Sequence, residues 1–344
     1  MKRAKEYFLM LIFLVLILIV TFYTIYDKNS LIVIFNTVKD IEIYYIIIFF
    51  IIIFLYFLLQ GIYMKTILGT LKQKVSLKKC VFYSMIEFYF SGITPSSTGG
   101  QPVQLYYMTK DNIPIRKSYI TLMLNTIYFK LIVLILGILA LVFESDYIFS
   151  NGGIYILFFI LGFIVDLAMI ILCLYLVFKK DLISKVLTKL ISFAKRFKIF
   201  KKKVSNIDIE ETSARYKDEI SFINSHKLEV VFGFILTFIQ RLLLFSVIYV
   251  VYRALGFSEL NYFELLFIQV VVQMSIEAFP LPGGAGLSEG MLHSSFVMIF
   301  ASRLADVGML LTRTFSFYVP LIICGLVILF HNILSRKRKI NFKR

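Results

Sequence analysis

Six apolar runs, each long enough to cross a bilayer, constrain this 344-residue chain more than any other feature. A hydrocarbon core of about 30 Å needs roughly 20 helical residues. Hydrophobic residues make up 59% of the chain, and the mean hydropathy is +0.85. The sequence therefore predicts an all-α polytopic membrane protein with six full spans. The predicted spans are 8–26, 43–63, 118–143, 154–178, 229–255 and 307–330.

The first run follows a charged start, MKRAKEY, as the apolar part of a signal peptide does. The run is too long for a signal peptide and no small-residue cleavage site follows it, so we expect a retained first helix. The three cysteines and three histidines are scattered without metal-ligand spacing. We therefore expect no metal site and no cofactor, and we assign no catalytic residue.

The net charge of +16 would suggest a nucleic-acid partner in a soluble protein, but here the distribution of charge indicates topology. Of the 37 lysines and arginines, 30 fall into five segments that the positive-inside rule places in the cytoplasm. We expect no nucleic-acid partner and a multi-pass protein of the plasma membrane, with both termini in the cytoplasm. The basic segments are 2–5, 64–79, 110–117, 179–228 and the chain after 331.

The segment SGITPSSTGGQPVQLYYM, residues 91–108, is the most polar and helix-breaking part of this apolar chain. Basic segments flank it at 64–79 and 110–117, so the chain between them must enter and leave the membrane from the cytoplasmic face. We expect a re-entrant hairpin in which residues 80–92 enter, TPSSTGGQP turns at depth, and residues 102–109 return.

A second break, FPLPGGAGLSEG at residues 279–290, separates the apolar stretches 261–278 and 291–300. A single crossing here would leave the basic C-terminal tail outside, so we expect a second re-entrant hairpin that enters from outside. The chain then reads as helix, helix, re-entrant hairpin, helix, twice over and in opposite orientations. This order predicts an inverted-topology repeat with halves at about 5–143 and 154–335.

Broken helices at matching positions of inverted halves indicate a midplane substrate site in transporters. Non-helical backbone at that depth must be buried in protein or line a wet cavity, because each unsatisfied peptide group in hydrocarbon costs several kcal/mol. We expect the two breaks to meet, with glycines allowing close backbone approach and helix N-termini attracting an anion. The candidate substrate-binding residues are Thr94, Pro95, Ser96, Ser97, Thr98, Gly99, Gly100, Gln101, Pro280, Pro282, Gly283, Gly284, Gly286 and Glu289.

Charged residues inside or beside the spans are a second group of candidates. A charge at the centre of a membrane helix costs about 2.5–3.5 kcal/mol on insertion scales, so such residues are rarely accidental. For the charged residues, the alternatives to substrate contact are internal pairing, for example of Asp166 with Lys130 or Arg241, and snorkelling of Arg313. For the two breaks, the alternatives are ordinary kinks and hydroxyl groups that only cap the backbone. The candidates are Glu87, Lys130, Asp166, Arg241, Glu277 and Arg313.

The segment 179–228 carries thirteen basic residues and contains KKDLISKVLTKLISFAKRFKIFKKK. Apolar residues fall on one helical face of this stretch and lysines on the other, which is typical of an amphipathic helix on an anionic inner leaflet. We expect one transmembrane domain over residues 1–335, with this loop and a basic tail at 336–344 in the cytoplasm. Anionic inner-leaflet lipids are the expected partners of the loop.

The pair TPSSTGGQP and FPLPGGAGLSEG, about 180 residues apart, resembles the transmembrane, flippase-like family of lysylphosphatidylglycerol synthases, known from the multiple peptide resistance factor. The resemblance covers about residues 5–335. It implies movement of a lipid between leaflets, in the best-known members aminoacylated phosphatidylglycerol such as lysyl-phosphatidylglycerol. Exposure of that lipid makes the cell surface less anionic and repels cationic peptides.

Bifunctional members of that family also carry a large soluble domain that transfers an aminoacyl group from tRNA to lipid, whereas the longest soluble segment here, 179–228, has about 50 residues. We expect a flippase that binds a phospholipid headgroup between the breaks, as a homo-oligomer or beside a separate synthase. One alternative is a membrane-embedded transferase, such as a phosphatidylglycerol lysyltransferase, for which the first break is the only candidate region. Another alternative is an ion-coupled solute transporter in which Asp166 or Glu277 carries the proton. Candidate phosphate partners are Lys130, Arg241 and Arg313, and candidate ammonium partners are Asp166, Glu87 and Glu277.

Overall fold

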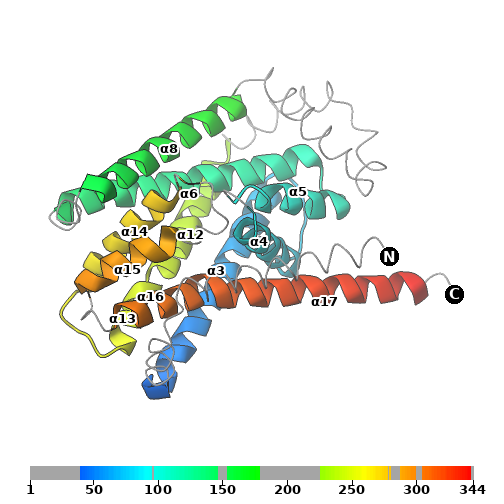
Figure 1. The fold of residues 1–344 in the computed structure, drawn as a ribbon. Helices are drawn as coiled ribbons and strands as arrows, with labels where there is room; N and C mark the ends of the chain where they lie inside the picture. The colour runs from blue at the N-terminus through cyan, green and yellow to red at the C-terminus, as the bar shows by residue number, and fades with distance from the viewer. Residues whose placement is uncertain are drawn as a thin grey trace.

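The computed structural model describes residues 39–94, 97–145, 153–178, 225–277, 279, 287–299 and 304–341, and these ranges are helical and contain no strand (Figure 1). The predicted first span and the predicted amphipathic helix lie outside them. In chain order the helices are α3 Ile43–Thr70, α4 Leu77–Gly92, α5 Gly100–Lys110, α6 Ile115–Phe143, α8 Gly153–Phe178, α12 Lys227–Phe245, α13 Val247–Ala254, α14 Tyr262–Glu277, α15 Leu287–Ile299, α16 Ala305–Arg313, the π-helix η3 Thr314–Tyr318 and α17 Val319–Asn341.

Five helical stretches of the described chain are long and apolar enough to cross a membrane, and each overlaps one of the six predicted spans. The number of spans stays a prediction. Their outer faces expose large apolar side chains. On α8, for example, Leu157, Ile160 and Ile164 are about half exposed and lie three to four residues apart, so they share one helical face. Soluble proteins rarely expose contiguous apolar surface of this extent. The chain is therefore an integral membrane protein. The five stretches are Ile43–Thr70, Ile115–Phe143, Ile156–Tyr175, Lys227–Ala254 and Ala305–Leu334.

The helices α4 and α5 form an antiparallel hairpin. At a rise of 1.5 Å per residue they are only about 24 Å and 16 Å long, which is shorter than a hydrocarbon core of about 30 Å. Their outer ends lie together, because Tyr83 donates a hydrogen bond to Asp111 at 2.6 Å and Lys79 pairs with the same carboxylate at 3.0 Å. This is the shape of the predicted hairpin, and its entry from the cytoplasmic side stays a prediction.

A second pair of short helices, α14 and α15, pack together through Leu265, Ile268, Met291 and Phe296. If α12 with α13, and α16 with η3 and α17, each count as one interrupted long helix, the described order is long helix, two short helices, long helix, and it occurs twice: α3 to α6, then α12 to α17. An internal repeat requires this order. The opposite orientation of the two halves stays a prediction.

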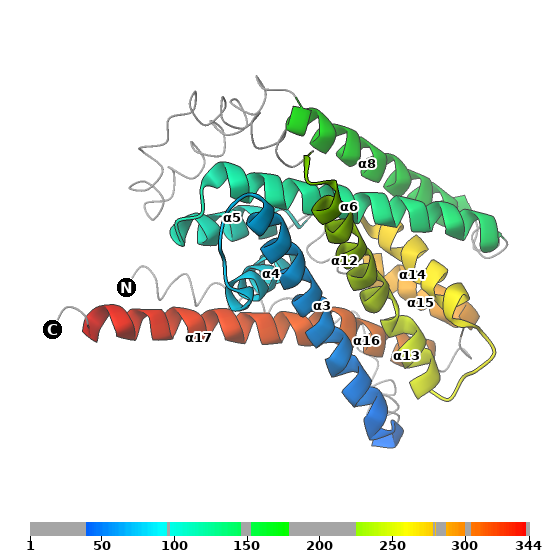
Figure 2. The same ribbon diagram turned by 180° about the vertical axis from the view of Figure 1, so that it is seen from behind.

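The two halves pack reciprocally, since the first helix of each hairpin contacts the long closing helix of the other half. A Cβ atom added to Gly92 of α4 would lie 2.7 Å from Leu321 of α17, and one added to Gly137 of α6 would lie 2.3 Å from Met274 of α14. In Figure 1 and in the reverse view of Figure 2, α4 and α5 lie between α6 and α17. The hairpins are thus interior elements of the fold.

Two predicted spans are interrupted helices. The span predicted at 229–255 breaks between α12 and α13 at Ser246, and the span predicted at 307–330 contains the π-helix η3. Pro320 explains the π turn, because it lacks an N–H and its ring would clash with the carbonyl of Ser316 in a regular helix.

Helix α17 continues to Asn341, past the predicted start of the basic tail at residue 336 and past the last apolar residues of the span. The cytoplasmic position of the tail stays a prediction. Lys and Arg are good helix formers, so basic residues can continue a helix beyond its apolar part.

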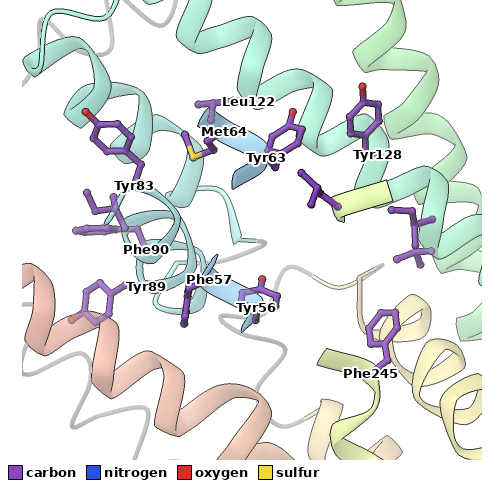
Figure 3. Packing of buried hydrophobic residues seen from close by; sticks show 14 of the residues in the cluster. Tyr56, Phe57, Tyr63, Met64, Tyr83, Tyr89, Phe90, Leu122, Tyr128 and Phe245 are labelled. Carbon is purple, nitrogen blue, oxygen red and sulfur yellow. The ribbon is translucent and has the colours of Figure 1, made fainter. Parts of the chain in front are cut away.

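Buried tyrosines tie α3, α6 and α12 together in the core that Figure 3 shows. Tyr63 donates a hydrogen bond to the carbonyl oxygen of Thr121 at 2.8 Å, and Tyr128 donates one to that of Val230 at 3.0 Å. The two rings meet edge to face with centroids 6.0 Å apart. These contacts fix the spacing of three helices that supply charged groups or their neighbours to the site.

Candidate functional site

The centre of the site is an ion cluster formed by Lys130 of α6, Asp166 of α8 and Glu277 of α14. The ammonium of Lys130 lies 2.6 Å from Oδ1 of Asp166 and also pairs with Glu277. Gln273 donates a hydrogen bond to the other oxygen of Glu277 at 2.7 Å. The side chain of Asp166 is fully buried, and those of Lys130 and Glu277 are each 12% exposed.

A close helix contact brings the two carboxylates together. Gly162 lies one helical turn before Asp166 on α8, and a Cβ atom there would lie 1.9 Å from the backbone oxygen of Met274 on α14. Only glycine allows the two backbones to approach this closely. As α14 ends three residues later at Glu277, its carboxylate reaches the level of Asp166.

Arg241 of α12 has different surroundings. Its guanidinium stacks on the ring of Phe129 at 4.0 Å and donates a long hydrogen bond of 3.4 Å to the hydroxyl of Tyr56. Within the described residues, its Nε has no hydrogen-bond partner and no carboxylate lies within ion-pair distance. Its charge interacts at longer range with that of Glu87 on α4. Arg241 is thus a cation held by aromatic rings rather than by an acid.

The turn of the first hairpin lies beside these groups. Ser91 donates a hydrogen bond to Glu87 at 3.0 Å, and the hydroxyl of Thr94 accepts one from the backbone N–H of Gly99 at 2.8 Å. The side chain of Gln101 donates to Thr126 of α6, one helical turn before Lys130. The first break therefore reaches the ion cluster along one face of α6.

Gly100 has a packing role that sequence reasoning missed. A Cβ atom there would lie 2.0 Å from Oγ of Ser91 and 2.7 Å from the carbonyl oxygen of Glu87. The glycine therefore lets α5 approach α4. The hydroxyl of Thr94 caps the backbone N–H of Gly99. The capping alternative that the sequence left open for Ser96, Ser97 and Thr98 stays a prediction.

The structure brings some of the predicted site residues together. Lys130, Asp166 and Glu277 form one cluster, which includes the internal pairing of Asp166 with Lys130 that the sequence left open. Lys130 and Arg241 both lie over the ring of Phe129, and Glu87 interacts with Arg241. Arg313 instead stacks on Phe317 at 4.6 Å. Ser97 and Thr98 lie at the turn with Gly99. The side chain of Glu289 lies outside the described residues, as do Pro95, Ser96, Pro280, Pro282, Gly283, Gly284 and Gly286.

Neighbours of the charged groups that were not predicted include Tyr56, Thr126, Phe129 and Gln273. A sequence signal existed for two of them. Gln273 is four residues before Glu277, so both lie on one helical face, and Phe129 directly precedes Lys130. Tyr56 and Thr126 reach the site only through the packing of separate helices.

A family model described as the lysylphosphatidylglycerol synthase TM region matches residues 8–324, which is most of the chain. The match includes both hairpins and all six charged candidates. No curated protein and no solved structure matches the chain significantly.

Proposed function

Because this chain belongs to the family of lysylphosphatidylglycerol synthase transmembrane regions, we propose that it is a translocase that moves a phospholipid between the leaflets of the plasma membrane. The proposed substrate is an aminoacylated phosphatidylglycerol such as lysyl-phosphatidylglycerol. Its movement to the outer leaflet would lower the negative charge of the surface and contribute to resistance against cationic peptides.

The observation that carries the proposal is that Arg241 has no acidic partner within ion-pair distance among the described residues. A guanidinium inside a membrane protein is costly unless it meets an acid, and within the described residues this one has only rings and a hydroxyl as close neighbours. A lipid phosphate would supply two oxygens in the geometry that the planar guanidinium fits. In this proposal Arg241 binds the phosphate during transport.

The carboxylates complete the headgroup site. Around Lys130 and Arg241 the described residues include the three acids Glu87, Asp166 and Glu277. An aminoacyl headgroup carries ammonium groups as well as a phosphate, so it can pair with both signs. The acyl chains would stay in the bilayer while the headgroup passes between the hairpins.

The test uses purified protein in vesicles of phosphatidylglycerol and phosphatidylcholine that contain lysyl-phosphatidylglycerol. An impermeant amine-reactive reagent measures the rate at which the lysyl lipid reaches the outer leaflet. Arg241→Ala removes a charge-assisted interaction of about 1.5–3 kcal/mol, so the rate should fall roughly 10- to 100-fold. Arg241→Lys should restore part of it, because lysine keeps the charge but loses the planar fork.

Arg253→Ala is the matched control, since Arg253 is exposed near the end of α13. It should leave the rate unchanged. Transport by well-inserted Arg241→Ala at the unmodified rate would contradict the phosphate role. Absence of transport by the unmodified protein, with or without the lysyl group on the lipid, would contradict the proposed function itself.

A further inference from the structure

The cluster of Lys130, Asp166 and Glu277 has one more acidic group than basic groups. Both carboxyl groups contact the same ammonium, and the charge of each acts on the other. Oδ2 of Asp166 is buried and has no donor among the described residues. With both carboxyl groups ionised, the cluster would carry a net charge of −1 in the interior.

Among the described residues, the helices around the cluster supply no second cation within ion-pair distance of its carboxyl groups. In the described chain, the charges that act on Asp166 are those of Lys130 and Glu277, and the charges that act on Glu277 are those of Lys130 and Asp166. The other titratable side chain that faces Lys130 is Cys173 on α8, which is buried. From α12, Arg241 acts on Glu87 and Tyr56 instead.

An uncompensated charge at this depth is expensive, and two carboxyl groups can hydrogen bond to each other only when one of them carries a proton. We propose that Asp166 and Glu277 share one proton in the lipid-free protein and release it when an ammonium group of the headgroup binds to them, so that lipid movement is linked to proton movement. This inference rests on the function proposed above.

The exchange keeps charge balanced at each step. The O–H bond of one carboxyl group breaks and its proton passes to water, while the incoming ammonium becomes the second counter-charge beside Lys130. No electrons are transferred. The ammonium of the headgroup later leaves, and a proton from water on the other side returns to the carboxylate.

The position of Glu277 suits such an exchange better than a fixed lock between helices. Glu277 is the last residue of α14 and stands directly before the second break, whereas Asp166 lies in the middle of α8. A lock between helices would need only one acid for Lys130. Glu277 is the second acid, and it stands at the end of its helix.

The experiment measures transport of lysyl-phosphatidylglycerol in the same vesicles under pH gradients of one unit in each direction. The rates for the two directions should differ, by up to about tenfold for one proton exchanged per lipid. A protonophore should remove the difference. A pH-sensitive dye inside the vesicles should report proton movement only when the lysyl lipid is present.

Two variants test the assignment to the cluster. Asp166→Asn keeps an oxygen for the hydrogen bond with Lys130 but cannot release a proton, and Glu277→Gln does the same from the other side. Each should move lipid at a rate that is independent of the gradient. Asp40→Asn and Glu42→Gln change exposed acids before α3 and should behave like the unmodified protein.

The outcomes separate the two claims. Lipid movement that depends on the gradient in the unmodified protein, and not in the inserted cluster variants, supports the inference. Lipid movement at one rate whatever the gradient overturns proton linkage and leaves the proposed function in place. If the cluster variants keep the full gradient dependence, the proton is carried elsewhere and the assignment is wrong. No lipid movement by the unmodified protein overturns the proposed function as well.

Discussion

At the scale of single residues, Lys130 and Arg241 differ in the groups that surround their charges. Lys130 carries a compact ammonium that two carboxyl groups approach from separate helices, whereas the planar guanidinium of Arg241 stacks on Phe129. Neither position would accommodate the side chain of the other. A lysine at 241 could not stack as a plane, and an arginine at 130 would bring a larger group between α8 and α14 where their backbones touch.

Gly100 allows a prediction at this scale. Gly100→Ala should lower the free energy of unfolding by about 1–3 kcal/mol, the usual cost of overpacking, because its Cβ would meet the backbone of Glu87 and the hydroxyl of Ser91. Gly69→Ala is the control, since a Cβ at that exposed position of α3 meets nothing within 4 Å. The measurement is the thermal unfolding of both variants in detergent. Equal stability of Gly100→Ala and the unmodified protein would contradict the tight contact between α4 and α5.

At the scale of elements, the first hairpin is closed at its outer end by Asp111. Burial alone would raise the pKa of Asp111, but hydrogen bonds from Tyr83 and Lys79 and the charges of Lys79 and Lys110 lower it below its usual value. A carboxylate with a lowered pKa in the folded state stabilises the fold above its unfolded pKa of about 3.9. That stabilisation is lost as the pH falls through the folded pKa.

The second prediction follows from the lowered pKa of Asp111, which makes its contribution to stability depend on pH. Asp111→Asn should lower thermal stability at neutral pH, because Lys79 loses its ionic partner, and it should reduce the further loss of stability between about pH 5 and pH 3. The measurement is the unfolding temperature of both proteins across this range. Asp40→Asn, at an exposed position, controls for a general effect of removing an acid. Parallel pH profiles for Asp111→Asn and the unmodified protein would show that the contact does not contribute.

The sequence predicts most described elements to within a few residues, because runs of apolar residues and their interruptions are local signals. The first hairpin was expected from 80 and begins at Leu77, and the stretch expected at 261–278 is α14, Tyr262–Glu277. The break at Ser246 was missed. Nothing in a uniformly apolar run separates α12 from α13, and Ser246 fits the break because its hydroxyl bonds to Leu242 and Tyr262.

The site is less predictable than the elements. The pairing of Lys130 with Asp166 was among the expected alternatives, because two opposite charges in neighbouring spans have few other partners. The contact of Glu277 with Lys130 was not among the expected alternatives. The two residues are 147 positions apart in the sequence, and only the packing of α14 on α6 and α8 brings them together. The neighbours of Arg241 depend on three helices in the same way.

At the scale of the whole molecule, the direction of the hairpin is open to a labelling test. Single cysteines replacing the exposed residues Lys74 and Lys110 should react with an impermeant reagent from the cytoplasmic side, and one replacing the exposed Ser258 should react from outside. The native Cys80, Cys173 and Cys324 are buried, and replacing them removes any background. Labelling of positions 74 and 110 from opposite sides would mean that the chain crosses the membrane once between them, and it would contradict the re-entrant hairpin.

Permeabilised cells serve as the control for that test, because all three positions should then react. If positions 74 and 110 share a side but that side is external, the hairpin stands and the inside–outside assignment is reversed. The expected pattern would instead support entry of the first hairpin from the cytoplasm, as the basic segments around it predict.

The reciprocal packing of the hairpins has a consequence for biosynthesis. The surface of α4 around Gly92 is covered by Leu321 of α17, which the ribosome makes 229 residues later, so at 5–20 residues per second the nascent hairpin waits about 10–45 seconds for its permanent neighbour. During that interval the first half stands in the membrane with its polar turn incompletely covered. Chains that stop before α17 should therefore be held by the insertion machinery or degraded, even though their first half contains every residue of one complete hairpin.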